Sequence, residues 1–235
     1  VDNYLRYTPK QLLGYYYYRL ILRRLYSAVW VPGIYSRRFL RYLGMIDRDI
    51  YEGLYSADPD VFFPPDQFEV RRGVVFVGQL SKRKGVMELA DAANYLTNKN
   101  DSLELRMIGH GPLASKLIAR GMKVEAFHQA AELGRLYRGA SALILPSKID
   151  HWGVVAHEAA LCGCLLLVTR QCGCVGELME HQVNGYVMER CSRDEILSAL
   201  RWLRELDDDA IARGRADSIR GAHTISPQRW VETLD

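Results

Sequence analysis

Short apolar runs alternate with amphipathic stretches from Arg72 onward, and this alternation limits the fold more than any other feature of the chain. Four continuous apolar runs are strand candidates: Val74–Val77, Leu103–Ile108, Ala142–Leu145 and Cys164–Val168. Val124–Phe127 is a weaker fifth. Runs that are apolar at every position suit a parallel sheet covered by helices on both faces. The pattern predicts βαβ units and an α/β fold.

The stretches between these runs have the spacing of amphipathic helices. The first of them has apolar residues three and four positions apart, at Val86, Leu89, Ala93 and Leu96. This spacing places them on one helix face. Near the carboxyl end, Ser226 followed by Pro227 is typical of a capped start of one more helix.

The first sixty residues differ in character, because tyrosine and arginine dominate them. We expect a helix over Leu12–Tyr26, with aromatic rings on all its sides. Such a helix either packs against protein outside this sequence or lies on a membrane surface, where tyrosine and arginine favour the headgroup region. Val29–Gly33 is typical of a short strand and turn, and Ser56–Asp66 of a linker. We therefore predict three parts, residues 1–65, 66–222 and 223–235.

Composition excludes several classes of protein. The net charge of +3 over 235 residues is too mild to indicate a nucleic-acid partner. No apolar run approaches the roughly 20 residues that cross a bilayer. The first residue is Val and no secretory signal follows it. We expect a fragment of a cytoplasmic protein, in contact with the inner face of a membrane if residues 1–26 bind lipid.

Four of the five cysteines form two Cys-Gly-Cys pairs, Cys162 with Cys164 and Cys172 with Cys174. Structural zinc sites more often have two to four residues within a pair, and Cys164 opens an apolar run typical of a buried strand. An odd count without a secretory signal also argues against disulfides. Reduced thiols, with no metal ligands, are therefore the expected state.

Two strand candidates lead into glycine-bearing loops. The run ending at Val77 continues through Gly78 and Gln79 to Lys84 and Gly85, a basic loop before a helix. Ligands of open α/β sheets lie where such loops meet helix amino ends, so Lys84 is placed to reach a diphosphate. The alternative is a merely solvated basic loop.

The second glycine-bearing loop follows the run ending at Ile108. Gly109, His110 and Gly111 permit close backbone approach. A dinucleotide fingerprint needs a third glycine at position 114, which is Ala114, so NAD is excluded as the leading interpretation.

The segment from Asp150 to Glu158 places two carboxylates around a loop-to-helix transition, with a glycine at 153 and an apolar run after it. A helix starting near Gly153 would offer free amides to an anion. Glu158 falls on a mostly buried helix, where an unpaired carboxylate is costly, so it needs a hydroxyl partner such as a ribose diol. Two alternatives stay open: Asp150 caps the helix, or His151 and His157 pair with the two acids in a structural network.

Taken in order, these motifs resemble the carboxyl-terminal, donor-binding domain of family 4 retaining glycosyltransferases, which have the GT-B fold with Rossmann-like halves. The resemblance runs from about residue 70 to 200 and includes the two glycine loops, Leu145-Pro146-Ser147, the paired acids, Glu177 and Asn184-Gly185-Tyr186. Residues 27–65 are similar to the end of the family's amino-terminal domain. The resemblance thus implies that most of that acceptor-side domain is absent from the sequence.

The resemblance implies retaining transfer of a sugar from a UDP- or GDP-linked donor to a glycan, lipid-linked or small-molecule acceptor, without a required metal or other cofactor. By position, Lys84 would neutralise the leaving diphosphate, Asp150 would bind a donor-sugar hydroxyl and Glu158 the ribose. The other donor-binding positions would be Gly78, Gln79, Gly109, His110, His151, Trp152, Gly153 and Val154.

Two positions depart from the family's pattern. Asp150 stands where the family has glutamate, which shortens its reach by one methylene. Gln79 stands where the family usually has arginine, which removes a positive charge from the diphosphate site and predicts weaker donor binding or slower transfer. The alternative function is a non-catalytic remnant that binds protein or membrane through its Tyr/Arg segment.

Overall fold

The computed structural model describes residues 8–53, 55–67, 73–99, 104–228 and 231. Their central feature is a six-stranded sheet of order β5-β4-β3-β6-β7-β8, in which every neighbouring pair is parallel. The strands are β3 (Val74–Val77), β4 (Leu105–Ile108), β5 (Val124–Glu125), β6 (Ala142–Leu145), β7 (Leu165–Thr169) and β8 (Gly185–Met188). The predicted α/β fold is confirmed.

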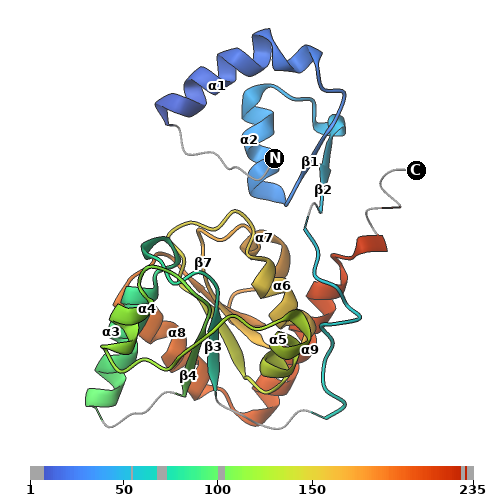
Figure 1. The fold of residues 1–235 in the computed structure, drawn as a ribbon. Coiled ribbons are helices and arrows are strands. Elements are labelled where there is room, and N and C mark those ends of the chain that lie inside the picture. The colour runs from blue at the N-terminus through green and yellow to red at the C-terminus, as the bar shows by residue number, and fades with distance from the viewer. Residues whose placement is uncertain (1–7, 54, 68–72, 100–103, 229–230, 232–235) are drawn as a thin grey trace.

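Helices cover both faces of this sheet, as Figure 1 shows, with α3, α4 and α8 on one side and α5, α6 and α9 on the other. Their bounds are α3 (Val86–Asn98), α4 (Ala114–Ile118), α5 (Ala130–Arg138), α6 (Val154–Leu161), α8 (Arg193–Glu205) and α9 (Asp208–His223). All residues of β3, β6 and β7 are buried. The apolar cluster formed by the sheet and its helices runs from Ala57 to Ile225, and we refer to this part as the sheet domain.

The order of strands reverses between β3 and β6, and we refer to the region at the carboxyl ends of these two strands as the crevice. From β3 the chain adds β4 and β5 on one side, and then returns to add β6, β7 and β8 on the other. The helices that follow β3 and β6 therefore lie on opposite faces of the sheet, and open α/β sheets bind their ligands at such a reversal of strand order. The loop after β3 carries a short 3-10 helix, η3 (Lys82–Lys84), and the loop after β7 leads to α7 (Val175–Leu178).

Residues 8–53 form a smaller unit, the N-terminal lobe, with its own apolar cluster. It contains α1 (Pro9–Leu20), η1 (Leu22–Arg24), β1 (Val29–Val31), α2 (Ile34–Leu43), η2 (Asp47–Asp49) and β2 (Ile50–Glu52). β1 and β2 pair in parallel as a two-stranded sheet. Figure 1 shows this lobe above the carboxyl edge of the large sheet.

Several predicted bounds need correction. The helix predicted over Leu12–Tyr26 instead spans Pro9–Leu20, because the Thr8 side chain accepts from the Gln11 amide and a proline opens the first turn. Its carboxyl end is followed by η1. The apolar run from 124 to 127 supplies only a two-residue edge strand, and β7 begins one residue later than predicted.

At the carboxyl end, Pro227, Gln228 and Val231 are helical, as the capped start predicts. The remainder of that predicted helix lies outside the described residues, as does Leu103. Within the described part of the chain, no helix has the length and apolarity needed to cross a membrane.

Candidate functional site

The loops singled out in the sequence meet at the carboxyl edge of the sheet. The loops after β3 and β6 are fastened to each other, since the Lys148 amide donates to the Arg83 carbonyl at 2.8 Å and the Arg83 guanidinium donates to the Ile149 carbonyl at 3.0 Å. Both loops lie where the strand order reverses, and ligands of open α/β sheets bind at such a position. The fold thus assembles a candidate site there.

Lys84 and Asp150 form a buried ion pair at the centre of this site. The Lys84 ammonium donates to Asp150 Oδ2, and the two residues are only 8% and 9% exposed. The alternative in which Asp150 caps α6 is wrong, because the N-cap position belongs to Gly153 and no side chain bonds there. A charged pair out of water holds both groups in one geometry, so the lysine is fixed at the crevice.

Helix α6 begins beside this pair, as predicted. Gly153 has φ of 89°, in the left-handed region that favours glycine, and a Cβ there would lie 3.8 Å from Asp150 Oδ2. Val154, the first helical residue, is half-buried. The first amides of a helix have no partner within it and carry a partial positive charge. An anion at this end of α6 would be near both those amides and Lys84.

The two glycine loops are also in contact. A Cβ at Gly109 would lie 2.0 Å from the Gly78 carbonyl oxygen, so only glycine permits this approach, and a Cβ at Gly78 would lie 3.9 Å from Lys84 Cε. Gln79 and His110 are exposed on these loops. The structure therefore brings the two loops that follow β3 and β4 together, and Gly78 of the first loop lies near the Lys84–Asp150 pair.

Glu158 is not part of that ion pair. It lies half-buried on α6, where its Oε2 accepts from the Tyr137 hydroxyl of α5 at 3.1 Å. Burial raises the pKa of Glu158, and the hydrogen bond from Tyr137 lowers it. The hydroxyl partner that burial of Glu158 requires is present within the protein, because packing of α5 on α6 supplies Tyr137.

His157 has a structural role that excludes its predicted pairing with the acids. Its Nδ1 accepts from the Ala57 amide and its Nε2 contacts the Ala222 carbonyl, both at 2.9 Å. Nδ1 accepts, so the ring proton resides on Nε2 and is donated to the carbonyl. Burial lowers the pKa of this imidazole. The ring thus ties the linker and the end of α9 to α6. His151, in the preceding loop, is half-buried.

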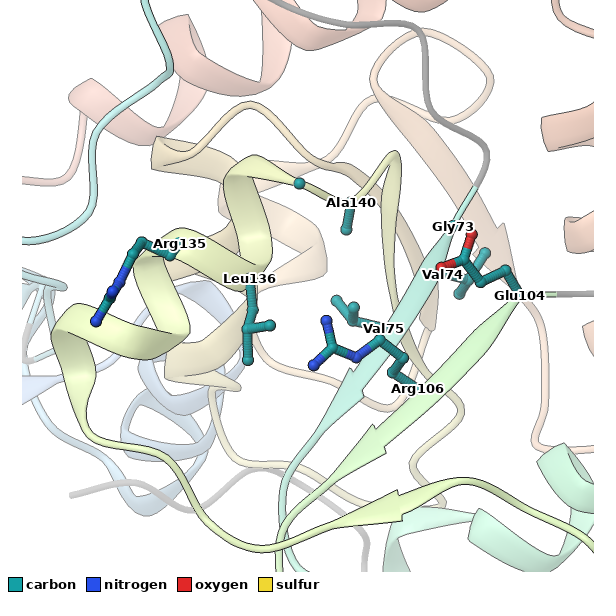
Figure 2. Close-up of a pocket in the computed structure, with 9 residues that line it drawn as sticks. Gly73, Val74, Val75, Glu104, Arg106, Arg135, Leu136 and Ala140 are labelled. Carbon is teal, nitrogen blue, oxygen red and sulfur yellow. The ribbon is translucent and has the colours of Figure 1, made fainter.

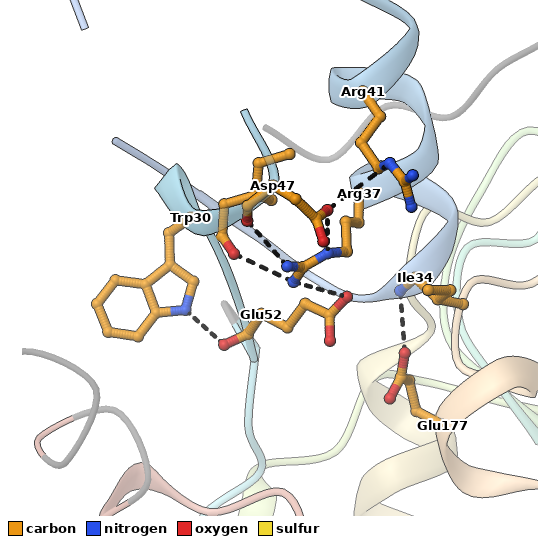
Figure 3. Close-up of polar contacts among 8 residues, drawn as sticks. Trp30, Ile34, Arg37, Arg41, Asp47, Glu52 and Glu177 are labelled. Carbon is orange, nitrogen blue, oxygen red and sulfur yellow. Dashed lines mark hydrogen bonds and ion pairs between the residues drawn. The ribbon is translucent and has the colours of Figure 1, made fainter. Parts of the chain in front are cut away.

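Trp152 packs toward the N-terminal lobe rather than toward the ion pair. A Cβ at Gly33 would lie 2.9 Å from both Trp152 Cζ3 and Glu177 Oε1, and the same carboxylate accepts from the Ile34 amide at 2.9 Å. Figure 3 shows Glu177 reaching up to the amino end of α2. The indole side chain of Trp152 therefore contributes to the contact between lobes, while its backbone remains in the loop before α6.

The carboxyl ends of both sheets face this contact. Pro32 follows β1 and Gly53 follows β2, and both line a hollow of about 40 Å³ with Trp152 and Glu177.

Within the N-terminal lobe, Arg37 donates to Asp47 Oδ1 at 3.0 Å, and its guanidinium lies 3.3 Å from a carboxylate oxygen of Glu52 (Figure 3).

A larger hollow, of about 350 Å³, lies at the opposite edge of the sheet (Figure 2). It is bordered by Gly73 and Glu104, which precede β3 and β4, and by Arg106 and Arg135. Arg106 already pairs with Glu125 through bonds of 2.6 and 2.7 Å. None of the predicted site residues borders this hollow.

The four cysteines of the two Cys-Gly-Cys pairs are free thiols, buried in the sheet domain. Burial raises the pKa of Cys162 and Cys172 to about 12, so these thiols stay protonated at neutral pH. Among the residues that the structure describes, no three His, Cys, Asp or Glu side chains gather as metal ligands would.

Sequence reasoning missed the parts played by Tyr137 and Glu177. Tyr137 belongs to an apolar helix stripe, and nothing in that pattern distinguishes its hydroxyl. Glu177 follows a glycine-bearing loop, but its contact with α2 joins residues 143 positions apart. Both contacts depend on how distant elements pack.

The strand order, the covered parallel sheet and the loops at its carboxyl edge define a Rossmann-like α/β domain, a class that includes many nucleotide-binding proteins. Residues 60–216 match the family model described as Glycosyl transferases group 1, and the chain belongs to this family. The sequence motifs resemble a glycosyltransferase family with the GT-B fold, and membership of a glycosyltransferase family is thereby confirmed.

Curated relatives cover the same region. A glycogen synthase of Mycobacterium tuberculosis is 30% identical over 156 residues, which are 63% of this chain and 37% of that protein. A D-inositol 3-phosphate glycosyltransferase of Pseudarthrobacter chlorophenolicus is 26% identical over 163 residues, 64% of this chain and 39% of the relative. The chain thus spans less than half the length of these relatives.

Solved structures share the fold. A mutant of S. aureus TarM, in complex with fondaparinux, alpha-GlcNAc-glycerol and UDP, superposes with a TM-score of 0.78 at 13% identity, covering 100% of this chain and 48% of TarM. Anabaena HepE, in complex with UDP and glucose, has a TM-score of 0.72 at 20% identity over 88% of this chain and 62% of its own. These likenesses confirm the arrangement of elements.

Proposed function

We propose that the chain carries the donor site of a family 4 retaining glycosyltransferase, which transfers a sugar from a UDP- or GDP-linked donor to a glycan, lipid-linked or small-molecule acceptor. The observation that carries the proposal is the buried Lys84–Asp150 pair beside the amino end of α6, in the crevice where the strand order diverges. The family supports it, as do the UDP and sugar ligands of two solved structures with this fold. The proposed donor domain is residues 66–222, followed by a crossover helix from 223.

In this proposal Lys84 stabilises the charge that develops on the diphosphate as the sugar leaves. Asp150 holds the lysine in place and contacts a donor-sugar hydroxyl, and Glu158 accepts from the ribose. Amides at the start of α6 bind phosphate and sugar. The exposed amide of Gln79 is uncharged, so this position adds no positive charge to the proposed diphosphate site. No metal takes part in these roles, and the proposed location is the cytoplasm.

Calorimetry with UDP-glucose and GDP-mannose tests the donor site. We expect binding that Lys84→Ala and Glu158→Ala abolish. Lys99→Ala is the matched control, because Lys99 is exposed at the far end of α3, and it should bind like the wild type. Binding should persist in EDTA. Absence of binding to every nucleotide sugar would refute the proposal for this chain.

Retention and acceptor class require a transfer assay. Incubating the chain with the donor that binds and with panels of glycan and lipid-linked acceptors should give a product whose anomeric proton coupling matches that of the donor. An inverted product would exclude the retaining mechanism.

A second candidate function is membrane binding through residues 1–26, within which α1 supports the proposal. Its exposed large apolar side chains include Leu13 and Leu20, 72% and 71% exposed, and Arg19, Arg23 and Arg24 follow along α1 and η1. Exposed apolar and basic groups together suit an anionic lipid surface. Co-sedimentation with phosphatidylserine vesicles should be lost when Leu13 and Leu20 are both changed to Asp. If the wild type does not co-sediment with the vesicles, membrane binding is excluded, and a protein partner for the exposed side chains of α1 is favoured.

A further inference from the structure

Tyr137 contacts Glu158, the proposed acceptor of the ribose hydroxyl, but has no role of its own in the proposed reaction. Tyr137 is 0% exposed, and its hydroxyl donates to Glu158 Oε2 at 3.1 Å across the packed helices α5 and α6. Burial, and then the nearby Glu158 carboxylate, raise the pKa of the Tyr137 phenol well above its usual value. The phenol therefore remains a hydrogen-bond donor throughout the physiological range.

The tyrosine ring is held firmly. It packs on Phe62 of the linker with ring centroids 6.1 Å apart, and the backbone carbonyl of Tyr137 accepts from the Cys164 thiol at 3.2 Å and from the Ala140 amide at 3.0 Å. The ring contact and the fixed backbone together confine the Tyr137 hydroxyl to a small region. The hydroxyl in turn fixes the rotation of the carboxylate to which it donates.

The hydrogen bond leaves one carboxylate oxygen available. A carboxylate has about four acceptor positions on its two oxygens. Within the described residues, Tyr137 is the only hydrogen-bond partner of the Glu158 side-chain carboxylate, and it uses Oε2. The residue is half-buried rather than sealed, so Oε1 can receive a hydroxyl from a ligand in the crevice. An unoriented carboxylate would lose more rotational freedom on binding that hydroxyl.

We propose that Tyr137 is a positioning residue, which orients Glu158 so that its Oε1 accepts from the 2′-hydroxyl of the donor ribose and makes the site prefer ribonucleotides over 2′-deoxyribonucleotides. The inference rests on the proposed function. Tyr137 itself does not touch the donor. Its effect should therefore appear only where the ribose hydroxyl is present.

Calorimetry of the 235-residue chain with UDP and GDP, each paired with its 2′-deoxy form, measures this preference. Since hydrogen bonds to charged groups contribute about 1.5–3 kcal/mol, the wild type should favour the ribonucleotide by on the order of 10- to 100-fold. Tyr137→Phe removes one oxygen atom and retains the ring. We expect it to reduce the preference to below about threefold while the affinity for the deoxynucleotide changes less than about twofold.

Two further variants complete the test. Tyr95→Phe is the matched control, because Tyr95 is an exposed tyrosine on α3, and it should retain the wild-type preference. Glu158→Gln should lose the preference, and adding Tyr137→Phe to it should cause little further change. Equal weakening of both nucleotides by Tyr137→Phe, or an unchanged preference, would overturn the inference.

A measurement on the wild type covers the case in which Tyr137→Phe does not fold. With tyrosine labelled by ¹³C at the ζ carbon, the Tyr137 resonance should shift on addition of the ribonucleotide and shift less with the deoxy form. The same shift with both, or none with either bound, would overturn the inference. Failure of the wild type to bind any of the four nucleotides would instead refute the proposed function and this inference with it.

Discussion

The sheet domain and the N-terminal lobe bury their apolar residues to different extents. In the sheet domain, every residue of β3, β6 and β7 is buried between two layers of helices. In the N-terminal lobe, α1 leaves Leu13 and Leu20 largely in solvent, and the two-stranded sheet is supported by the ion pairs of Arg37. Because apolar burial is the main stabilising contribution to a fold, the comparison teaches that most of the free energy of unfolding resides in the sheet domain.

The largest expected effect sharpens this comparison at the centre of the sheet domain. Lys84→Met leaves the Asp150 carboxylate buried without its partner, and we expect a loss of about 3–5 kcal/mol in the free energy of unfolding. Urea denaturation measures it. Adding Asp150→Leu should recover most of the loss, since an apolar pair of similar volume needs no charge compensation. A double variant as unstable as the single one would contradict this account.

A matched pair of apolar truncations sets the two parts of the chain directly against each other. Ile144→Ala empties space in the fully buried strand β6 and should cost about 2–5 kcal/mol. Leu13→Ala removes an exposed side chain from α1 and should change stability by less than about 0.5 kcal/mol. Thermal or urea unfolding compares them. Similar losses would show that α1 is covered in solution and would break the comparison.

The contact between the two parts should have a smaller effect. Glu177→Ala removes the carboxylate that accepts from the Ile34 amide at the start of α2, and helix capping of this kind contributes about 1 kcal/mol. Hydrogen exchange at the Ile34 amide should accelerate. Glu180→Ala, a change at an exposed glutamate three residues away, is the control and should leave the exchange rate unaltered.

The smallest expected effect concerns pH and the linker. The pKa of His157 is lowered in the fold by burial, so the unfolded chain binds its proton more readily. Its contribution is therefore present above pH about 6.5, the ordinary value, and is lost as pH falls toward the folded pKa. His157→Gln can make similar bonds without titrating. Its unfolding free energy should decline less between pH 7 and 5 than that of the wild type, and parallel curves would contradict the assignment.

Much of the fold could be predicted from the sequence because it depends on local patterns. The buried strands are continuous apolar runs, and the start of α6 was marked by Gly153, whose left-handed backbone few other residues adopt. The bounds of α1 were less accessible, because residues with aromatic rings on all sides give no periodic stripe. There the capping by Thr8 decides where the helix begins.

The candidate site divides in the same way. Its loops could be placed together because the carboxyl ends of parallel strands share one edge of the sheet. The contact of Lys84 with Asp150 across 66 positions, and the turning of Trp152 toward Gly33, depend on side-chain packing that no spacing in the sequence encodes. The partner of Glu158 was missed for the same reason, since the rotation of α5 against α6 determines it.

The attachment of the linker to His157 decides where the chain can bend. Ala57 is tied to α6 through this ring, and Phe62 packs on Tyr137 five residues later, so this stretch has to travel with the sheet domain. On the return crossing, Ala222 is held by the same imidazole. The linker and the end of α9 are thereby attached to the same helix, α6, through one side chain. Because one imidazole holds both segments, loss of the His157 ring would release the linker and the end of α9 from α6 together.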